Sequence, residues 1–463
     1  MQSRTLKNFL NYAIGDILIK GFLFISIPIF SYLFDPIQYG YYSLINNSII
    51  ILYVFISLNL QNAVINRCMI TKKNLYSYLS TIIYFIIPFQ IILILFEPFY
   101  SAFISYYLGI NQKDFIFILI ICIMLTYIYI YTAYLQASSQ SYHYIMINTI
   151  SKIIETILIF YFAYFLTSNK YMSKIYAQII INIIIIIYII VSFKFKFSKF
   201  KFKYLKEALI FSIPLMGHVI SNALLAQIDK IIISKFIGLY DAGIYSFTYN
   251  FSICIIIIII AWNSAWRPNF YYFLNNKNYC VIKKITYGST ILIFLTCIIS
   301  MLFSKEMIYF LSSYKYHSSI PILPLIIIGN ALIHIYLIYV NFLFYKRKTI
   351  IISCATFGVL IINIILNYYL VPKFNITGSA CSTIISYFFL ALLNYSITTY
   401  ITKNNIISFK YLIFYTIGLL STYPIILYLN NLNLIISLLI KFIIFSIIIM
   451  FIKKFAILKL LNN

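Results

Sequence analysis

Acidic residues are scarce in this chain: nine Asp and Glu stand against 34 Lys and Arg, and charged residues make up only 9% of its 463 positions. Hydrophobic residues make up 63%, and no polar connection is long enough to form an aqueous domain. This composition excludes an ordinary soluble globular protein and predicts one integral membrane body. We expect an all-α fold, because a helix satisfies its backbone polar groups within a single segment of hydrocarbon.

Motifs for metals, disulfides and nucleotides are missing from the sequence. The seven cysteines are scattered, mostly inside apolar runs and with no CxxC pair, so we interpret them as small packing residues. No GxxxxGK[ST] motif occurs, which excludes nucleotide hydrolysis by a P-loop. We therefore expect no cofactor and no metal.

The apolar residues form fourteen runs, each suited to a membrane-spanning helix of about 20 residues. The predicted spans are 9–33, 40–65, 77–100, 114–137, 144–167, 175–193, 208–237, 242–266, 285–304, 321–345, 349–371, 376–400, 411–429 and 433–452.

The connections between these spans alternate between basic and nearly uncharged. One class holds 23 of the 34 Lys and Arg, and five more lie inside spans or at their ends. The other class holds six, which are Lys113, Lys170, Lys174, Lys305, Lys315 and Lys373. Because Lys and Arg accumulate in short cytoplasmic loops, the basic class predicts the cytoplasmic side, with both termini on it. The net charge of +25 is spread over many loops and forms no single stripe, so we expect no nucleic acid partner.

Residues 194–206, KFKFSKFKFKYLK, are the one compositional break inside the chain. Alternating Lys and aromatic residues suit a segment that lies at the lipid headgroups. The segment predicts a cytoplasmic linker between an N-lobe of six spans at 1–193 and a C-lobe of six spans at 207–400. Residues 401–463 then contain the last two spans and a cytoplasmic tail.

A weak internal repeat relates the two predicted lobes. A shift of 203 positions aligns SYLFDPIQYGYYSL at 31–44 with SKFIGLYDAGIYSF at 234–247 without a gap. Both segments form the turn between the first and second span of their own lobe. Two six-helix repeats related by an axis along the membrane normal are a transporter architecture. The matched pairs are Ser31 with Ser234, Gly40 with Gly243, Tyr42 with Tyr245, and Ser43 with Ser246.

Two stretches of the chain, residues 213–250 and 343–387, carry a family pattern. Residues 213–250 contain Pro, a later Asp followed by a base, then Gly and Gly-x-Tyr. Both stretches resemble the polysaccharide transport family, the Wzx-type flippases of the multidrug/oligosaccharidyl-lipid/polysaccharide exporter superfamily. Asn375 departs from that pattern, because the family usually has Gly there. Within residues 343–387, the matching positions are Asn363, Asn367, Pro372, Gly378, Ala380, Thr383 and Ser386.

The resemblance implies a flippase of lipid-linked oligosaccharides. Its substrate would be an undecaprenyl-diphosphate-linked sugar unit, such as an O-antigen or capsule repeat. The protein would move this unit from the inner to the outer leaflet of the bacterial cytoplasmic membrane by alternating access, coupled to an ion. The implied partners are this substrate, membrane lipids and other polysaccharide assembly proteins.

Ionisable residues inside the spans are the candidates for a site, because a charge at a helix centre costs about 2.5–3.5 kcal/mol to insert. Asp16 and Lys20 lie four positions apart in the first span, and Lys152 and Glu155 lie three apart in the fifth. Each spacing places the pair on one helix face. We predict that Lys20 and Lys152 line a wet cavity and hold the diphosphate, and that Asp16 and Glu155 couple ions. The alternative is that each pair is a self-neutralising salt bridge that lets its helix insert.

The seventh span adds three candidates. His218 lies near mid-depth and is predicted to line the same cavity, with a hydrogen bond between helices as the alternative. Asp229 and Lys230 lie near the outer end of the span, where they would form an outer gate or a packing contact between the lobes. Two other acids, Asp114 and Glu306, lie at outer helix ends, where we expect solvation.

Two other functions compete with the flippase. A drug or cation exporter of the same superfamily would need an acidic cavity, whereas the two predicted pairs contribute as many bases as acids. A membrane enzyme of lipid-linked glycans, such as a polymerase or ligase, would need a sizeable outer loop with acids, His or Arg. The outer connections are short and carry few such groups, so we expect a transporter and not an enzyme.

Reporter fusions test the predicted orientation. Fusions after residues 199 and 463 should both behave as cytoplasmic, because the basic connections place the linker and the C-terminus on that side. A periplasmic signal from either fusion would mean that the list of spans is wrong by an odd number.

Overall fold

The computed structural model describes residues 21–70, 74–138, 140–192, 198–346, 348–402 and 408–461. Within these ranges all secondary structure is helical, and eleven helices are long and apolar enough to cross a membrane. The expected all-α membrane fold is therefore confirmed. The chain forms two compact units, Met1–Ser246 and Phe247–Asn463. The division into lobes at the 194–206 linker stays a prediction.

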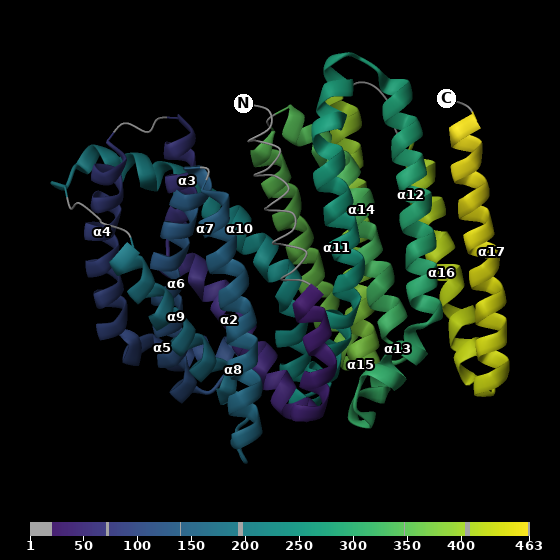
Figure 1. Cartoon of the computed structure of the whole chain (residues 1–463), viewed down its shortest axis with the longest axis horizontal. Coiled ribbons are helices and arrows are strands. Elements are labelled where there is room, and N and C mark those ends of the chain that lie inside the picture. The colour runs from purple at the N-terminus through teal and green to yellow at the C-terminus, as the bar shows by residue number, and fades with distance from the viewer. Residues whose placement is uncertain are drawn as a thin grey trace. The chain divides into compact units, whose positions relative to one another are not determined.

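The first unit is built around one central helix, α6, which packs against α2, α3, α4, α5 and α9. α6 begins at Gln112 and ends at Ala137, and its side chains at Ile118, Ile121 and Cys122 are fully buried. The unit also has an apolar helix at Gly21–Leu33. Its other elements, shown in Figure 1, are α2 (Pro36–Ile56), α3 (Leu60–Ile70), α4 (Leu75–Leu95), α5 (Glu97–Leu108), α7 (Ser141–Ile145), the π-helix η1 (Met146–Ile150), α8 (Ser151–Phe165), α9 (Met172–Ser192) and α10 (Phe202–Phe236).

Two predicted spans of this unit differ from the helices found. The predicted second span, 40–65, is broken because Leu58 and Asn59 adopt positive φ angles of 47° and 55°, which ends the right-handed helix. The predicted third span, 77–100, ends early at Leu95, and the chain turns at Phe96 into the separate helix α5. A hydropathy window extends through both turns, because each turn is short and the helices on either side of it are largely apolar.

The second unit is organised around α14, which is buried along most of its length. α14 packs against α12, α15 and α16 and donates an interhelical hydrogen bond from Asn330 to Ser252, at 2.7 Å. Such bonds satisfy polar groups that hydrocarbon cannot solvate. The elements are α11 (Leu239–Asn275, which begins in the first unit), α12 (Tyr279–Leu302), α13 (Ser304–Leu311), the 3-10 helix η2 (Tyr314–Ser319), α14 (Leu323–Tyr345), α15 (Thr349–Thr402), α16 (Phe409–Asn431) and α17 (Leu434–Leu461).

The predicted spans 349–371 and 376–400 lie on α15, which bends between them. Asn375 has φ 54° and ψ −142°, a backbone conformation that Gly adopts far more readily than other residues. This explains physically why the resembling family usually has Gly at the position. Gly378 follows the bend, and a Cβ atom there would overlap the carbonyl oxygen of Leu370. The bend therefore depends on a small residue at 378.

Gly40 and Gly243 face each other where α2 and α11 begin. A Cβ atom added at Gly40 would overlap the carbonyl oxygen of Leu239, and one added at Gly243 would overlap that of Pro36. The offset of 203 positions relates Gly40 to Gly243 and also Pro36 to Leu239. The two aligned segments of the repeat therefore pack on each other through equivalent atoms, and only glycine permits the approach.

Alanine at Gly243 should destabilise the protein. The added Cβ pushes α11 away from the Pro36 carbonyl, and overpacking of this kind costs about 1–3 kcal/mol. Gly217→Ala in α10 is the matched control, because a Cβ there meets no atom within 4 Å and alanine favours a helix by about 0.8–1.0 kcal/mol. Thermal unfolding of the purified proteins in detergent should show a lower midpoint for Gly243→Ala only. Equal midpoints for the two variants would contradict a close glycine contact.

Candidate functional site

A cluster of three charged side chains joins α8 to α9 in the first unit. The Glu155 carboxylate accepts a hydrogen bond from Lys152 at 2.7 Å through Oε2 and one from Lys174 at 2.5 Å through Oε1. Lys152 precedes Glu155 by three positions on α8, so one helix face presents both. Lys174 reaches the same carboxylate from the first turn of α9.

The three members of the cluster differ in exposure. The side chains of Glu155 and Lys174 are 7% and 5% exposed, whereas that of Lys152 is 40% exposed. A buried carboxylate needs a partner charge, because removing either partner leaves an uncompensated charge in a medium that solvates it poorly. Glu155 and Lys174 neutralise each other in the interior. Lys152 therefore adds a positive charge at the accessible edge of the cluster.

Lys174 is a site residue that the sequence prediction missed. The sequence predicts an outer loop there, one residue before the predicted span 175–193, whereas the structure places Lys174 in α9 and buries it. The second turn of α8 contacts the first turn of the antiparallel α9 because α8 projects beyond the start of α9, as the lower edge of the unit in Figure 1 shows. The position of Lys174 at a span edge was the available signal. The stagger between α8 and α9 cannot be predicted from the sequence of either helix.

The predicted residues of the seventh span lie on α10 and make none of the ion pairs of this cluster. His218 is half-buried, and its Nε2 lies 3.1 Å from the Asn222 side-chain nitrogen one turn later. Asp229 and Lys230 are both buried. Lys230 donates to Gln227 at 2.9 Å, and Tyr245 of α11 donates to Asp229 at 3.2 Å. Their roles as cavity wall and gate stay predictions.

The first-span candidates, Asp16 and Lys20, lie outside the described residues. The structure therefore does not place the predicted cavity pair next to Lys152 or away from it. Of the two predicted pairs, the one that can be described is the fifth-span pair. In this pair Lys152 and Glu155 form an ion pair at 2.7 Å, which is the contact that the salt-bridge alternative describes, and their roles in substrate binding and ion coupling stay predictions.

Two acids that we expected to be solvated are paired with other side chains and shielded from water instead. Asp114, at the start of α6, is 5% exposed and accepts a hydrogen bond from the Tyr41 hydroxyl at 2.9 Å. Glu306 on α13 forms an ion pair with the fully buried Lys441 of α17 at 2.7 Å. The expectation was wrong because helix ends that pack against neighbouring helices are shielded from water. In the described part of the chain, no three His, Cys, Asp or Glu side chains gather as metal ligands do.

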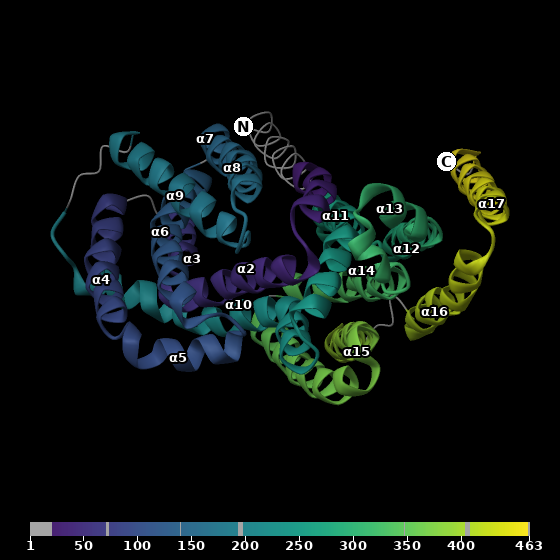
Figure 2. The same ribbon diagram turned by 90° about the horizontal axis from the view of Figure 1, so that it is seen from below.

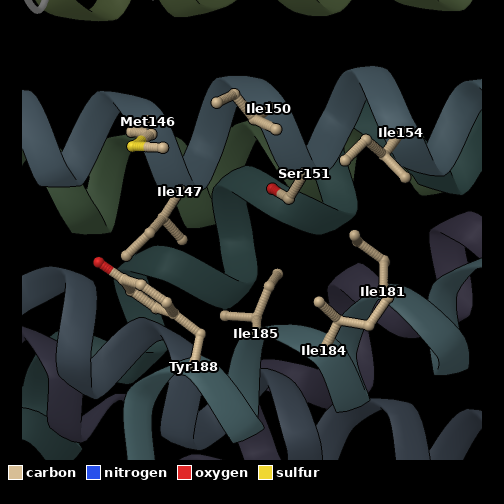
Figure 3. A pocket seen from close by; sticks show the side chains of 9 residues that line it. All are labelled: Met146, Ile147, Ile150, Ser151, Ile154, Ile181, Ile184, Ile185 and Tyr188. Atoms are coloured by element: carbon tan, nitrogen blue, oxygen red, sulfur yellow. The ribbon is translucent and has the colours of Figure 1, made fainter. Parts of the chain in front are cut away.

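An apolar groove of about 160 Å³ lies between η1 and α8 on one side and α9 on the other. Figure 3 shows that Ile147 of η1 faces the side chains of α9, among them Ile185 and Tyr188, across this space. Lys152, the accessible member of the cluster, is about 100° around the helix from Ser151 and about 200° from Ile154, so it lies on a different side of α8 from the groove, and no charged side chain lines the groove. We therefore exclude the groove from the site. The groove is lined by Met146, Ile147, Ile150, Ser151, Ile154, Ile181, Ile184, Ile185 and Tyr188.

Comparison with known proteins relates this geometry to a family. The Lsg locus putative protein 1 of Haemophilus influenzae is 26% identical over 217 residues, which are 45% of this chain and 48% of that protein. The matched region therefore spans about half the length of this relative.

Two solved structures share the fold over most of the chain. The lipid II flippase MurJ in an inward closed conformation has a TM-score of 0.64 at 16% identity, covering 98% of this chain and 100% of MurJ. An inward-facing multidrug resistance MATE transporter of the MOP superfamily has a TM-score of 0.63 at 11% identity, covering 86% and 99%. At these identities the likeness concerns the fold. The model of the polysaccharide biosynthesis protein family matches residues 5–273, more than half of the sequence. The resemblance inferred from the motifs is thereby confirmed, and the chain belongs to the polysaccharide biosynthesis protein family.

Proposed function

We propose that this protein is a flippase that moves an undecaprenyl-diphosphate-linked oligosaccharide from the inner to the outer leaflet of the bacterial cytoplasmic membrane. The observation that carries the proposal is the Lys152–Glu155–Lys174 cluster, which bears one more positive than negative charge and presents Lys152 at its accessible edge. An O-antigen or capsule repeat unit is a substrate of this class. Membrane lipids and other polysaccharide assembly proteins are the expected partners.

An anionic diphosphate is the group that this cluster suits. An ammonium group forms short, strong hydrogen bonds to phosphate oxygens, and Lys152 can rotate its three N–H donors toward a headgroup that approaches from the exposed side. Glu155 holds the Lys152 ammonium group in place at 2.7 Å, since the two residues lie three positions apart on one helix. Lys174 neutralises the negative charge of Glu155 from the buried side. The positive charge of Lys152 is therefore available to bind the substrate.

A cation exporter with the same fold is the second candidate function. It would need an accessible acid, but Glu155 is 7% exposed and has two lysine partners. A cationic drug approaching this edge would meet the ammonium group of Lys152 first. A glycan polymerase or ligase has no comparable support, because the fold and family are those of transporters. The charge of the cluster favours the flippase over both alternatives.

Alternating access gives the glycine contact a role in this proposal. The two aligned repeat segments meet through Gly40 and Gly243, and a change that exposes the opposite leaflet would separate them. The neighbouring hydrogen bond from Tyr245 to Asp229 ties α11 to α10 in the same region. This location supports the predicted role of Asp229 and Lys230 as a gate.

Substitution of Lys152 should reduce transport without removing the protein from the membrane. Lys152→Gln leaves the buried Glu155–Lys174 pair neutral and intact, so insertion should be normal. A lost hydrogen bond to a charged group costs about 1.5–3 kcal/mol, so apparent substrate affinity should fall about tenfold or more. Uptake of a labelled lipid-linked sugar into proteoliposomes, normalised to protein, measures this change.

Lys174→Gln is the matched control, because it removes the same charge from the buried side of the cluster. It should lower the thermal midpoint of the protein, since Lys174 is 5% exposed and a broken buried ion pair is destabilising. Transport per inserted molecule should fall less than in Lys152→Gln. Equal losses per molecule would contradict direct substrate contact by Lys152 and leave only an effect of total charge.

Ion coupling by Asp16 and Glu155 is the other testable part of the proposal. Glu155 is engaged by two ammonium groups, so it can bind a proton or sodium ion only after a conformational change moves a lysine away. Transport in proteoliposomes should respond to an imposed pH or sodium gradient, and Asp16→Asn should abolish this response while substrate binding remains. A full gradient response in the Asp16→Asn/Glu155→Gln protein would eliminate both carboxylates as coupling groups.

A further inference from the structure

Helix α5 in the first unit has its polarity reversed relative to a helix of a soluble protein. Its inner face is made of Ser101, Ser105 and Leu108, which are 1%, 2% and 8% exposed. The opposite face carries Phe99, which is 83% exposed, together with further aromatic residues. Water would not be compatible with such a face, because a contiguous exposed aromatic surface needs a partner to cover it.

The aromatic residues of α5 form a continuous stripe along the helix. Phe99, Phe103, Tyr106 and Tyr107 are spaced by four, three and one positions, which places them on neighbouring turns of one side. Phe103 is 67% exposed and Tyr106 is 72% exposed. The stripe ends in two hydroxyl groups, so it is both apolar and hydrogen-bonding. Tyrosine and other amphipathic rings are enriched at the boundary between membrane and water.

The orientation of α5 matches that boundary. α4, which precedes it, crosses the membrane by length and composition, and the chain turns at the single residue Phe96 before α5 begins. α8 is long in Figure 1 and foreshortened in Figure 2, whereas α5 lies lengthwise in both views, across the end of the spans. A helix in this position lies in the membrane plane.

Contacts within the unit fix which side of α5 faces outward. The Tyr100 hydroxyl donates to the Leu93 carbonyl of α4 at 2.7 Å, and Gln112 of α6 donates to Ser101 at 3.1 Å. These bonds hold the serine side against the bundle. On the other side the Lys235 ammonium lies 4.6 Å and 4.7 Å from the ring centres of Tyr106 and Tyr107. A cation beside exposed tyrosine rings is typical of the headgroup region.

We propose that α5 is an interfacial anchor whose aromatic stripe is embedded in the headgroup and upper acyl region of the lipid leaflet opposite the basic connections. In the predicted orientation this is the outer leaflet. Lipid is the occupant because the helices on both sides of α5, α4 and α6, span the bilayer, so α5 is bound to the surface where they emerge. Its aromatic face has the composition of a membrane-surface helix.

Single tryptophan fluorescence in lipid vesicles tests the anchor. Trp262 and Trp266 are replaced by Phe, and a reporter is introduced as Phe103→Trp, a conservative change at an exposed ring. The full-length protein is reconstituted into phosphatidylcholine carrying bromine either near the carbonyl end or near the methyl end of the acyl chain. The shallow bromine should cause the larger loss of fluorescence at position 103.

Ile87→Trp in α4 is the depth control, because Ile87 lies mid-helix and is 40% exposed. It should show the reverse order, with the deep bromine quenching more strongly. A position 103 reporter that neither lipid quenches and acrylamide does quench would place α5 in water and overturn the proposal. A reporter protected from acrylamide and from both lipids would mean that protein, such as a second copy of the chain, covers the stripe, which also overturns it. Stronger quenching by the deep bromine would rule out an interfacial position.

Discussion

Hydrocarbon cannot solvate a polar group, and this constraint determines most of what the chain does structurally. Backbone amides in a span have no water to bond to, so each span must satisfy them internally as a helix. The same constraint acts on every buried side chain. Asn330 bonds to Ser252 across two helices, and Asp114 accepts a hydrogen bond from Tyr41. At these two positions a second helix supplies the partner that a polar residue in a span needs.

Charged residues follow the same rule with larger energies. Lys441 is fully buried and bonds both oxygens of Glu306 and the side chain of Asn430. Glu306 neutralises the charge of Lys441 within the second unit, since the pair consists of one acid and one base. The cluster around Glu155 differs because two lysines share one carboxylate. The excess of one positive charge in this cluster distinguishes a candidate binding group from a structural ion pair, because a buried charge is present in both.

Helix packing places a different demand on the chain, because two backbones approach closely only where side chains are small. Gly40 and Gly243 meet this demand at equivalent positions of the repeat, and Gly378 meets it at the bend of α15. α5 shows the complementary case. Its small polar residues face the bundle, and its large aromatic residues face away from it. In a membrane protein, size decides the inner face of such a helix more than hydrophobicity does.

The sequence by itself determined the all-helical membrane body, the approximate location of most spans and the placement of Lys152 and Glu155 on one helix face, because these depend on local composition and on the helical period. Tertiary structure alone decided that Lys174 completes the cluster, that the second and third predicted spans break, that Asp114 is buried and that Glu306 is paired with Lys441. A hydropathy window averages over about 20 residues and registers no left-handed residue at Leu58 or turn at Phe96. Which side chains of two helices meet depends on the stagger between those helices, and that stagger arises only when the helices pack.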